Sequence, residues 1–316
     1  MRIASLLPAA TEILYALGAG DAVVGVTHEC DFPAEARRKP SLIRPRIDAG
    51  ATPAEVDSRV HELAARGESL YVVDTGLFAS LAPDLIVTQD LCHVCAASPE
   101  TLAAALARLP PERAPRVITF TPHTLSDVWR GIVEIGAAAG HGSEAHQLAA
   151  RLEREVLAVS AAVASDPSIS RPRVLCLEWF DPPYVAGHWV PEMVRLAGGA
   201  DALGSEGKSS VQVTWQQILN AQPEVVVLMS CGYDLRRNRE AWASTLFPPG
   251  WEHLPAVRND RVYAVDANAY FSRPGPRLAQ GVALLASLLH PQIVRFDSAP
   301  GAFAAVHWQG VAAGSL

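Results

Sequence analysis

The sequence lacks any long apolar run: no stretch of its 316 residues is long enough and free enough of charge to span a membrane. No apolar segment with a cleavage site precedes the first expected strand, Ile3–Leu7. As it stands, the chain is therefore expected to stay in the cytoplasm. The five cysteines are few and odd in number, which argues against a disulfide framework and agrees with a reducing compartment.

Positive charge is also scarce. Lysine and arginine total 26 against 33 aspartate and glutamate, the net charge is −7, and no basic tract occurs, so a nucleic-acid partner is not expected. Several enzyme motifs are missing: there is no G-x-S-x-G, no G-x-G-x-x-G, no P-loop and no H-E-x-x-H. The sequence therefore predicts a protein that is not an enzyme.

What the chain does have is a regular alternation of strands and helices. Expected strands such as Val23–Thr27 and Leu85–Thr88 are each followed by a helical segment, and this order is typical of an α/β fold with parallel strands. An apolar content of 49% with 19% charged residues suits a globular protein long enough for two domains. The basic stretch Ser41–Ile47 shows no period and is expected to be irregular.

One long amphipathic helix is expected over Ser143–Ala164, about 33 Å long at about 1.5 Å per residue. Ser143 is its expected N-cap and Glu144 lies in its first turn. The helix is interpreted as a rigid connection between two similar lobes; the alternative is a surface helix of one large domain. Its apolar residues fall at helical spacing: Leu148, Leu152, Val156, Val159 and Val163.

An internal repeat supports two lobes. Thr11–Gly25 resembles Pro191–Gly204, and Leu81–Val87 resembles Ala221–Val227. Two copies of one unit suit a bilobal protein better than a tandem array, which needs three or more. The expected domains are an N-terminal lobe, connecting helices that include the long one, a C-terminal lobe and a tail without a pattern: 1–122, 123–166, 167–296 and 297–316.

Ligands of open α/β sheets bind beyond the carboxyl ends of the strands, so the residues at those positions are the candidate site. In the second half of the chain several of them are aromatic, notably Trp179, Phe180, Tyr270 and Phe271. Exposed rings in strand-end loops would favour a large, flat, partly apolar ligand. The alternative is that they pack beneath the loops.

Cysteine and histidine residues suggest a different chemistry, a metal site. Cys92, His93 and Cys95, together with His28 and Cys30 on another strand-end loop, have the nitrogen and sulfur ligands that zinc or iron prefers. One C-x-x-C is weak support, because a structural zinc needs a second pair. Buried thiols in a hydrogen-bonded loop are the alternative.

Several ordered motifs resemble the cobalamin-binding proteins of ABC transporters, the helical-backbone class III of substrate-binding proteins. The resemblance runs from Arg2 to about His290. It is carried by these segments: Ser5–Glu12, Val24–Thr27, Asp31–Pro33, Pro83–Ile86, Pro182–Tyr184, Gly187, Ala197–Gly199, and Phe271, Arg273, Pro276 and Arg277.

The resemblance implies two Rossmann-like lobes with central parallel sheets, joined by one long backbone helix, and a corrinoid such as cobalamin held in the cleft between them. A protein of this kind would serve uptake, salvage or intracellular delivery. Trp179 and Trp189 are added to the site from their loop positions. The residues carried over from the family are Pro8, Asp31 and Phe32 in the first lobe, and Phe180, Pro182, Tyr270, Phe271 and Arg273 in the second.

Two departures from the family bear on partners. Gly76 and Gln216 stand where relatives that dock on a permease usually carry glutamates, so docking salt bridges are not expected. The Cys92–Cys95 loop is foreign to the family pattern. A haem or ferric-siderophore binder of the same fold is a further alternative; for a siderophore the available cations are Arg44, Arg46, Arg236, Arg237 and Arg273.

Overall fold

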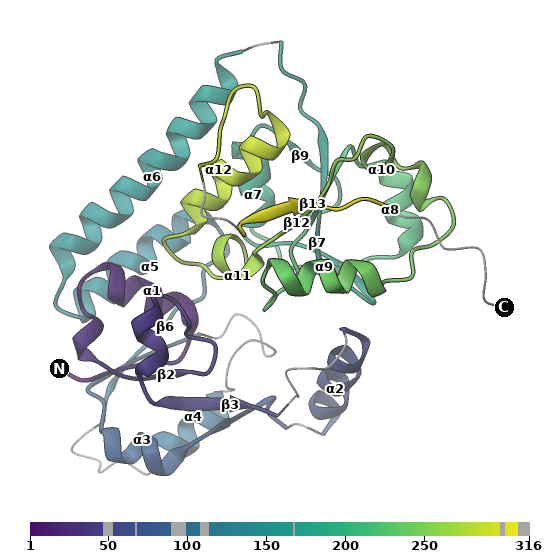
Figure 1. The fold of residues 1–316 in the computed structure, drawn as a ribbon. Helices are drawn as coiled ribbons and strands as arrows, with labels where there is room; N and C mark the ends of the chain where they lie inside the picture. Colours follow the sequence, from purple (N-terminus) through teal and green to yellow (C-terminus); the bar gives the residue numbers. More distant parts are fainter. Residues whose placement is uncertain are drawn as a thin grey trace. The chain divides into compact units, whose positions relative to one another are not determined.

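Two separate β-sheets organise this chain, one in each half of the sequence (Figure 1). The computed structural model describes residues 1–46, 53–66, 68–89, 99–107, 114–166, 168–297 and 301–308. Unit 1 comprises Met1–Pro122, Ser126–Glu153 and Pro274–Pro276; unit 2 comprises His123–Leu125, Arg154–Arg273 and Arg277–Leu316. The prediction of two α/β lobes with largely parallel sheets is confirmed.

The sheet of unit 1 has six strands in the order β4-β3-β2-β1-β5-β6. All neighbours are parallel except β3 and β4. Its strands are β1 (Ile3–Ser5), β2 (Val23–Thr27), β3 (Ser41–Pro45), β4 (Tyr71–Val73), β5 (Leu85–Thr88) and β6 (Arg116–Thr119). Its helices are α1 (Pro8–Ala16), η1 (Gly20–Ala22), η2 (Ala34–Arg38), α2 (Pro53–Ala65), α3 (Thr75–Leu81), α4 (Pro99–Leu106) and most of α5 (Leu125–Ala138).

The prediction of an irregular Ser41–Ile47 is wrong, because β3 lies there between β2 and β4. Leu42 and Ile43 are both buried, so the strand shows no apolar-polar alternation in the sequence. Its pairing with β2 also shifts in register between Val26 and Thr27. This strand therefore forms because it pairs with β2 and β4, and no local sequence pattern predicts it.

The sheet of unit 2 has seven strands, in the order β10-β8-β7-β11-β12-β13, with β9 paired to β7. Its strands are β7 (Arg173–Phe180), β8 (Pro183–Val185), β9 (Ala200–Asp201), β10 (Val211–Gln212), β11 (Val225–Leu228), β12 (Val262–Val265) and β13 (Phe303–Ala305). Its helices are α7 (Val190–Leu196), α8 (Trp215–Ala221), α9 (Leu235–Ser244), η4 (Trp251–His253), α10 (Pro255–Arg258), α11 (Ala267–Tyr270) and α12 (Leu278–Leu289).

Unit 2 differs from the prediction on both sides of its central strands. β8 runs back antiparallel to β7, where only strand-end loop residues were expected. On the other side β13 pairs antiparallel with β12, within the stretch 297–316 that was expected to be a tail without a pattern. Three-residue strands carry too little periodicity to be recognised, and they form because an open sheet edge offers hydrogen-bonding partners.

The long helix is α6, Gly142–Ala164, whose residues up to Glu153 belong to unit 1 and the rest to unit 2. Four members of the predicted apolar stripe are buried (Leu148, Leu152, Val156 and Val163), and Val159 is half-buried. The cap prediction is wrong: the helix already begins at Gly142, and the carbonyl oxygen of His141 accepts the first helical hydrogen bond, from the Ala145 N–H.

The internal repeat is visible in the hydrogen bonding. Helices α3 and α8 both end at a left-handed residue, Ala82 (φ 39°) and Gln222 (φ 47°), before a proline and a central strand. The Arg2 N–H donates to the Asp84 carboxylate at 2.7 Å, and the Arg173 N–H donates to the Glu224 carboxylate at 2.9 Å. The same local sequence thus builds the same corner in both units.

Candidate ligand-binding site

The carboxyl ends of β7, β11 and β12 lie at one edge of the unit 2 sheet, because these three strands are parallel neighbours. Side chains that follow them are therefore brought close together although they come from distant parts of the sequence. This edge carries the predicted residues Trp179, Phe180, Tyr270, Phe271 and Arg273. We call it the unit 2 edge.

A cluster at the unit 2 edge joins two aromatic rings and a guanidinium group. The rings of Trp179 and Tyr233 lie with their centroids 5.4 Å apart, tilted by 57°. The Arg237 guanidinium carbon lies 4.0 Å from the centroid of the Tyr233 ring. Burial raises the pKa of the Tyr233 hydroxyl, and Arg237 partly offsets that rise. We call Trp179, Tyr233 and Arg237 the Tyr233 cluster.

Tyr233, in the turn that follows β11, is not among the residues that the sequence predicts for the site. Its place at the site depends on a contact between distant segments: the Tyr233 carbonyl oxygen accepts hydrogen bonds from the N–H groups of Ala267 and Asn268. Those residues open α11, the short helix that ends in Tyr270. The turn after β11 and the turn after β12 are thereby tied into one surface.

Three aromatic residues expected in exposed loops are instead buried. Phe180 and Phe271 are each 1% exposed and Trp189 is 5% exposed. Phe180 belongs to the last position of β7 and to the main apolar cluster of unit 2, and Trp189 donates its indole N–H to the Phe271 carbonyl oxygen at 2.7 Å. These rings therefore belong to the interior of unit 2 and not to its exposed surface.

Trp179 and Tyr270 are the rings of the predicted set that remain partly exposed. Trp179 is oriented by its indole N–H, which donates to the Asp181 carbonyl oxygen at 3.2 Å. Burial raises the pKa of the Tyr270 hydroxyl, and the Asp266 carboxylate raises it further. At neutral pH Tyr270 therefore offers a neutral hydroxyl, which can donate a hydrogen bond.

Two further predicted residues lie beside this surface. Pro182 is half-buried and follows a cis peptide bond with Asp181. Arg273 is buried, with 9% of its surface exposed. Burial raises the pKa of the Asp266 carboxyl group, and the positive charge of Arg273 partly offsets that rise.

In unit 1 the predicted residues lie at the start of α1 and after β2. Pro8 is the first residue of α1 and is half-buried. Asp31 is half-buried, with a carboxylate oxygen 3.9 Å from an Arg37 nitrogen, and Phe32 is 46% exposed. The Phe32 ring is thus open to solvent in a way that the buried rings of unit 2 are not.

The thiol of Cys30 lies in a small network of hydroxyl groups. It is 3.1 Å from the Thr11 hydroxyl, which donates to it, and 3.3 Å from the Thr27 hydroxyl. His28 places Nδ1 3.2 Å from the Ile43 carbonyl oxygen, and its ring lies beside Tyr71. Both predicted metal ligands therefore have protein partners of their own.

The rest of the expected metal site, Cys92, His93 and Cys95, lies outside the described residues. Within the described ranges, no three or more histidine, cysteine, aspartate or glutamate side chains are grouped closely enough to hold a metal ion. The metal alternative therefore stays a prediction.

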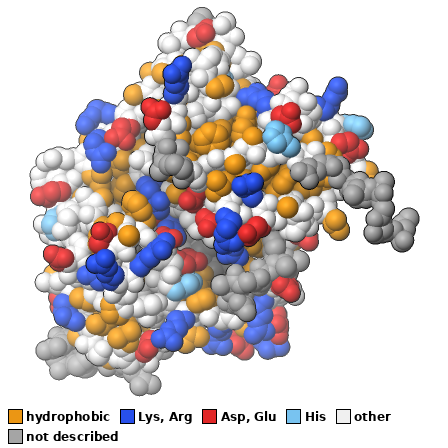
Figure 2. Space-filling model, viewed as in Figure 1, with side chains coloured by type: hydrophobic (Ala, Val, Ile, Leu, Met, Phe, Trp, Pro, Cys, Tyr) orange, Lys and Arg blue, Asp and Glu red, His pale blue; other side chains and the backbone are white. Residues whose placement is uncertain are grey.

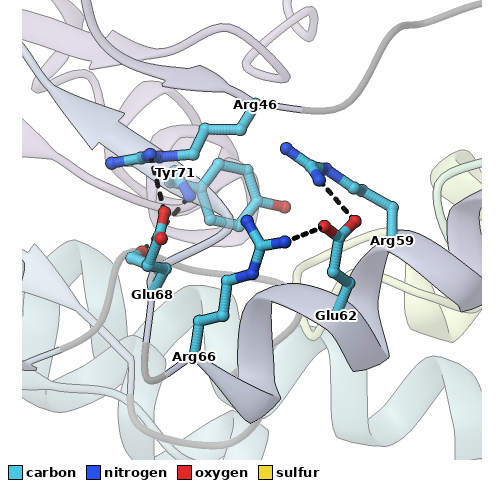
Figure 3. A network of polar contacts seen from close by, with 7 residues as sticks. Arg46, Arg59, Glu62, Arg66, Glu68 and Tyr71 are labelled. Carbon is cyan, nitrogen blue, oxygen red and sulfur yellow. Dashed lines mark hydrogen bonds and ion pairs between the residues drawn. The ribbon is translucent and has the colours of Figure 1, made fainter.

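Arginine residues of unit 1 are neutralised by glutamates around α2 and β3 (Figure 3). Arg46 pairs with Glu68 at 3.1 Å, while Glu62 accepts from both Arg59 and Arg66. The hydrogen bond from Arg59, together with the two positive charges, lowers the pKa of the Glu62 carboxyl. Arg46 is therefore not a free cation for an anionic ligand, as the siderophore alternative would require.

Charge on the molecular surface is mixed rather than segregated. On the face drawn in Figure 2, basic and acidic side chains alternate and no single basic patch dominates. Among the described residues, no helix has the length and apolar character needed to cross a membrane.

A hollow of about 1040 Å³ opens elsewhere on unit 2, along α9 and β13. Its lining includes Arg239, Trp242, Leu246 and Trp308, together with Asp234 and Asp266. None of the residues predicted to contact a corrinoid lines it; Arg236, a cation of the siderophore alternative, does. Because a binding site of this fold class is expected beyond the strand ends, the unit 2 edge remains the candidate site.

The positions aligned with docking glutamates occupy equivalent places. Gly76 is the second residue of α3 and Gln216 is the second residue of α8. The Gln216 amide donates to the Asn220 side chain at 2.9 Å. Among the described residues, the nearest atom to where a Cβ would stand on Gly76 is an Asp74 carboxylate oxygen, 3.6 Å away.

Comparison with known proteins places these features in a family. The family model described as "Periplasmic binding protein" matches residues 3–269. The chain is 26% identical over 293 residues to an uncharacterized ABC transporter substrate-binding lipoprotein, YvrC, of Bacillus subtilis, covering 92% of this chain and 80% of that protein. It is 24% identical to the vitamin B12-binding protein of Vibrio parahaemolyticus, covering 89% of this chain and 86% of that protein.

Among solved structures, the periplasmic heme-binding protein RhuT from Roseiflexus sp. RS-1 is similar to this chain. The TM-score is 0.67 with 26% sequence identity, and the similarity covers 92% of this chain and 98% of that one. The shared architecture extends over nearly the whole of both chains. Relatives of one fold thus carry names that refer to two different tetrapyrrole-derived ligands.

Proposed function

The chain belongs to the periplasmic binding protein family, which is a family of binding proteins and not of enzymes, and from that premise we propose that it binds a corrinoid at the unit 2 edge. The observation that carries the proposal is the pair of neighbouring rings, Trp179 and Tyr233, at the carboxyl ends of parallel strands. Aromatic rings at this place suit a large, flat, partly apolar ligand.

Corrinoid is the first candidate, supported by the cobalamin-type sequence motifs and by the vitamin B12-binding relative, which aligns with 89% of this chain. Haem is the second candidate, supported by the similar heme-binding structure. Both ligands are broad and planar, so ring contact and release of water favour binding of either one. Pro8, Asp31 and Phe32 are proposed as ligand contacts of unit 1.

The relative named as an ABC transporter lipoprotein supports a role in solute uptake, with a permease as partner. The absence of glutamate at Gly76 and Gln216 argues against docking by paired salt bridges, so intracellular salvage or delivery is the alternative role. Cell fractionation with an antibody to the chain separates the two, because uptake requires the protein outside the cytoplasmic membrane.

The function is tested by incubating the purified protein with hydroxocobalamin or with haemin, desalting it and recording the absorbance spectrum. Retention of one equivalent of corrinoid, with little haem, is the expected result. Retention of haem alone would replace corrinoid by the second candidate. Retention of neither would overturn the proposal.

Two variants sharpen the test. Trp179→Ala should reduce corrinoid retention, whereas Trp308→Ala, which removes an indole packed on Trp242 and Phe247, should not. The double variant Cys92→Ser/Cys95→Ser addresses the metal alternative. Corrinoid bands and bound metal should be unchanged in it; a loss of metal or a shift of the cobalt bands would favour a thiolate site.

A further inference from the structure

Arg237 differs from other arginine residues of unit 2 in what it touches. Arg236, its neighbour in α9, pairs with Glu240 at 2.8 Å, Arg195 pairs with Glu206 at 2.6 Å, and Arg173 lies 3.5 Å from Glu224. Across the described ranges, no carboxylate lies within ion-pair distance of the Arg237 guanidinium. Its neighbour is the Tyr233 ring, 4.0 Å away.

The backbone and the ring together hold Arg237 in place. The Arg237 N–H donates to the Asp234 carboxylate at 2.8 Å, which fixes the first turn of α9. The guanidinium then lies over a tyrosine that is only 5% exposed and is itself hydrogen-bonded through its carbonyl oxygen to α11. A guanidinium stacked on a ring loses less freedom when an anion binds, and those of its N–H groups that do not reach the Tyr233 hydroxyl stay available.

We infer that Arg237 receives an anionic substituent, a carboxylate or a phosphodiester, of the ligand that binds at the unit 2 edge, and thereby selects among ligands of one class. The inference rests on the proposed function. Trp179 offers an apolar face 5.4 Å from the Tyr233 ring, and Arg237 offers a planar fork of donors beside it. That combination fits a flat macrocycle with charged side arms, since a fork of N–H groups matches both anions in two parallel hydrogen bonds.

The inference goes beyond the residues expected from the family pattern. The sequence offered Arg237 only as one of several cations, and Arg46 and Arg236 of that set are paired with glutamates in the structure. Packing alone would explain an arginine on a ring, but if Arg237 only packs, its replacement should weaken the binding of every ligand equally. If Arg237 selects by charge, its replacement should weaken the binding of ligands with anionic side arms more than that of ligands without them.

The test compares three ligands by equilibrium titration. Cyanocobalamin carries one phosphodiester; dicyanocobinamide has the same ring with cyanide on cobalt but lacks the nucleotide and its phosphodiester; haemin carries two propionates. Arg237→Gln should weaken binding of the phosphodiester ligand, or of the carboxylate ligand, by about tenfold or more, because a charge-assisted hydrogen bond is lost. Binding of dicyanocobinamide should change less than about twofold.

Arg236→Gln is the matched control, because it removes an adjacent, exposed guanidinium that is already paired with Glu240. It should leave all three affinities unchanged. Arg237→Lys should fall between the wild type and Arg237→Gln, because the charge remains while the fork is lost. Thermal unfolding and near-ultraviolet circular dichroism of each variant report whether the Trp179 and Tyr233 rings keep their packing.

Equal weakening for all three ligands, or no change for any, would overturn the inference while leaving the proposed function standing. Binding of none of the three by the wild-type protein would overturn the proposed function and this inference with it. A selective loss for haemin identifies carboxylate as the anion, and a selective loss for cyanocobalamin identifies phosphodiester. Raising the salt concentration should reduce the difference between wild type and Arg237→Gln.

Discussion

Units 1 and 2 share the hydrogen bonds and helix ends that frame their sheets, but they differ in the residues that follow the strands. In both, a backbone N–H at the start of the first strand donates to a carboxylate just before a central strand. Arg2, just before β1, donates to Asp84, and Arg173, the first residue of β7, donates to Glu224. In both, a helix ends at a left-handed residue followed by proline. In each unit the frame is therefore held by a hydrogen bond between segments far apart in the sequence, and this bond does not depend on which residues follow the strands.

The strand-end residues, by contrast, have separate chemistries. After β2, unit 1 holds a thiol among hydroxyl groups, Cys30 with Thr11 and Thr27, and an exposed Phe32. After β7 and β11, unit 2 holds Trp179 and Tyr233. The proposed function therefore assigns ring contact and charge selection chiefly to unit 2.

The largest expected effect is on stability, and it differs between a tightly packed glycine of unit 2 and a loosely packed glycine of unit 1. A Cβ at Gly281, in α12, would collide with the Tyr270 carbonyl oxygen and lie 2.7 Å from the Met193 methyl group. Gly281→Ala should lower the free energy of unfolding by about 2–4 kcal/mol, because backbone must move. Gly76→Ala, in open space on α3, should raise it by up to about 1 kcal/mol. Chemical denaturation measures both; equal values would contradict the packing argument.

A smaller effect is expected on ligand affinity. Trp179→Ala should weaken corrinoid binding by about tenfold or more, as for a central aromatic contact, while Phe32→Ala should weaken it by no more than a few-fold. Isothermal titration with cyanocobalamin gives both values. A larger loss for Phe32→Ala would reverse the assignment of the principal surface to unit 2.

A pH effect on stability is expected in unit 2. Burial lowers the pKa of His188 below its usual 6.5, and His123, whose ring centroid lies 5.5 Å away, lowers it further. The folded protein thus binds this proton less readily than the unfolded chain, so His188 makes the free energy of unfolding fall as pH drops below 6.5 towards the folded pKa.

The matched variant for this effect is His188→Asn. Asparagine tolerates the left-handed backbone at this position, where φ is 53°. Subtracting its unfolding curve from that of the wild type between pH 7 and 5 removes contributions of opposite sign, such as those of Asp201 and Asp266, whose pKa values burial raises. A difference that does not change with pH would contradict the role given to His188.

The smallest effect should be equal in the two units. Asp84→Ala and Glu224→Ala each remove the acceptor of one strand-initial N–H and should each cost about 0.5–1.5 kcal/mol of stability. Denaturant titration of the two variants, with the double variant as a check on additivity, measures this. A clear difference between the two stability losses would show that the repeated hydrogen bond contributes unequally to the stability of the two units.

Much of the secondary structure was predictable because local sequence patterns specify it. Leu85–Thr88 is a strand with the predicted bounds. Asp74, a residue type that favours N-cap positions, caps α3, and its carboxylate accepts from the Leu77 N–H at 2.9 Å. Capping, left-handed helix ends and prolines act within a few residues, so a reader of the sequence can find them.

The candidate site was less predictable. The sequence named Trp179, Tyr270 and Arg273 near the strand ends but also counted Phe180, Phe271 and Trp189 as exposed, and it passed over Tyr233. The antiparallel return of β8 buries Phe180, and the bonds from Ala267 and Asn268 to Tyr233 create the joined surface. Neither feature has a local signal, because each depends on pairing between segments far apart in the chain.

By itself, then, the sequence determined the two α/β units, their repeated corners and the long helix α6, since periodicity, caps and turn residues act over short distances. Tertiary structure alone decided which rings are buried, that β3, β8 and β13 exist, and that Arg237 lies on Tyr233 and not beside a carboxylate. The physical reason is that edge-strand pairing and side-chain burial are set by partners that the local sequence does not specify.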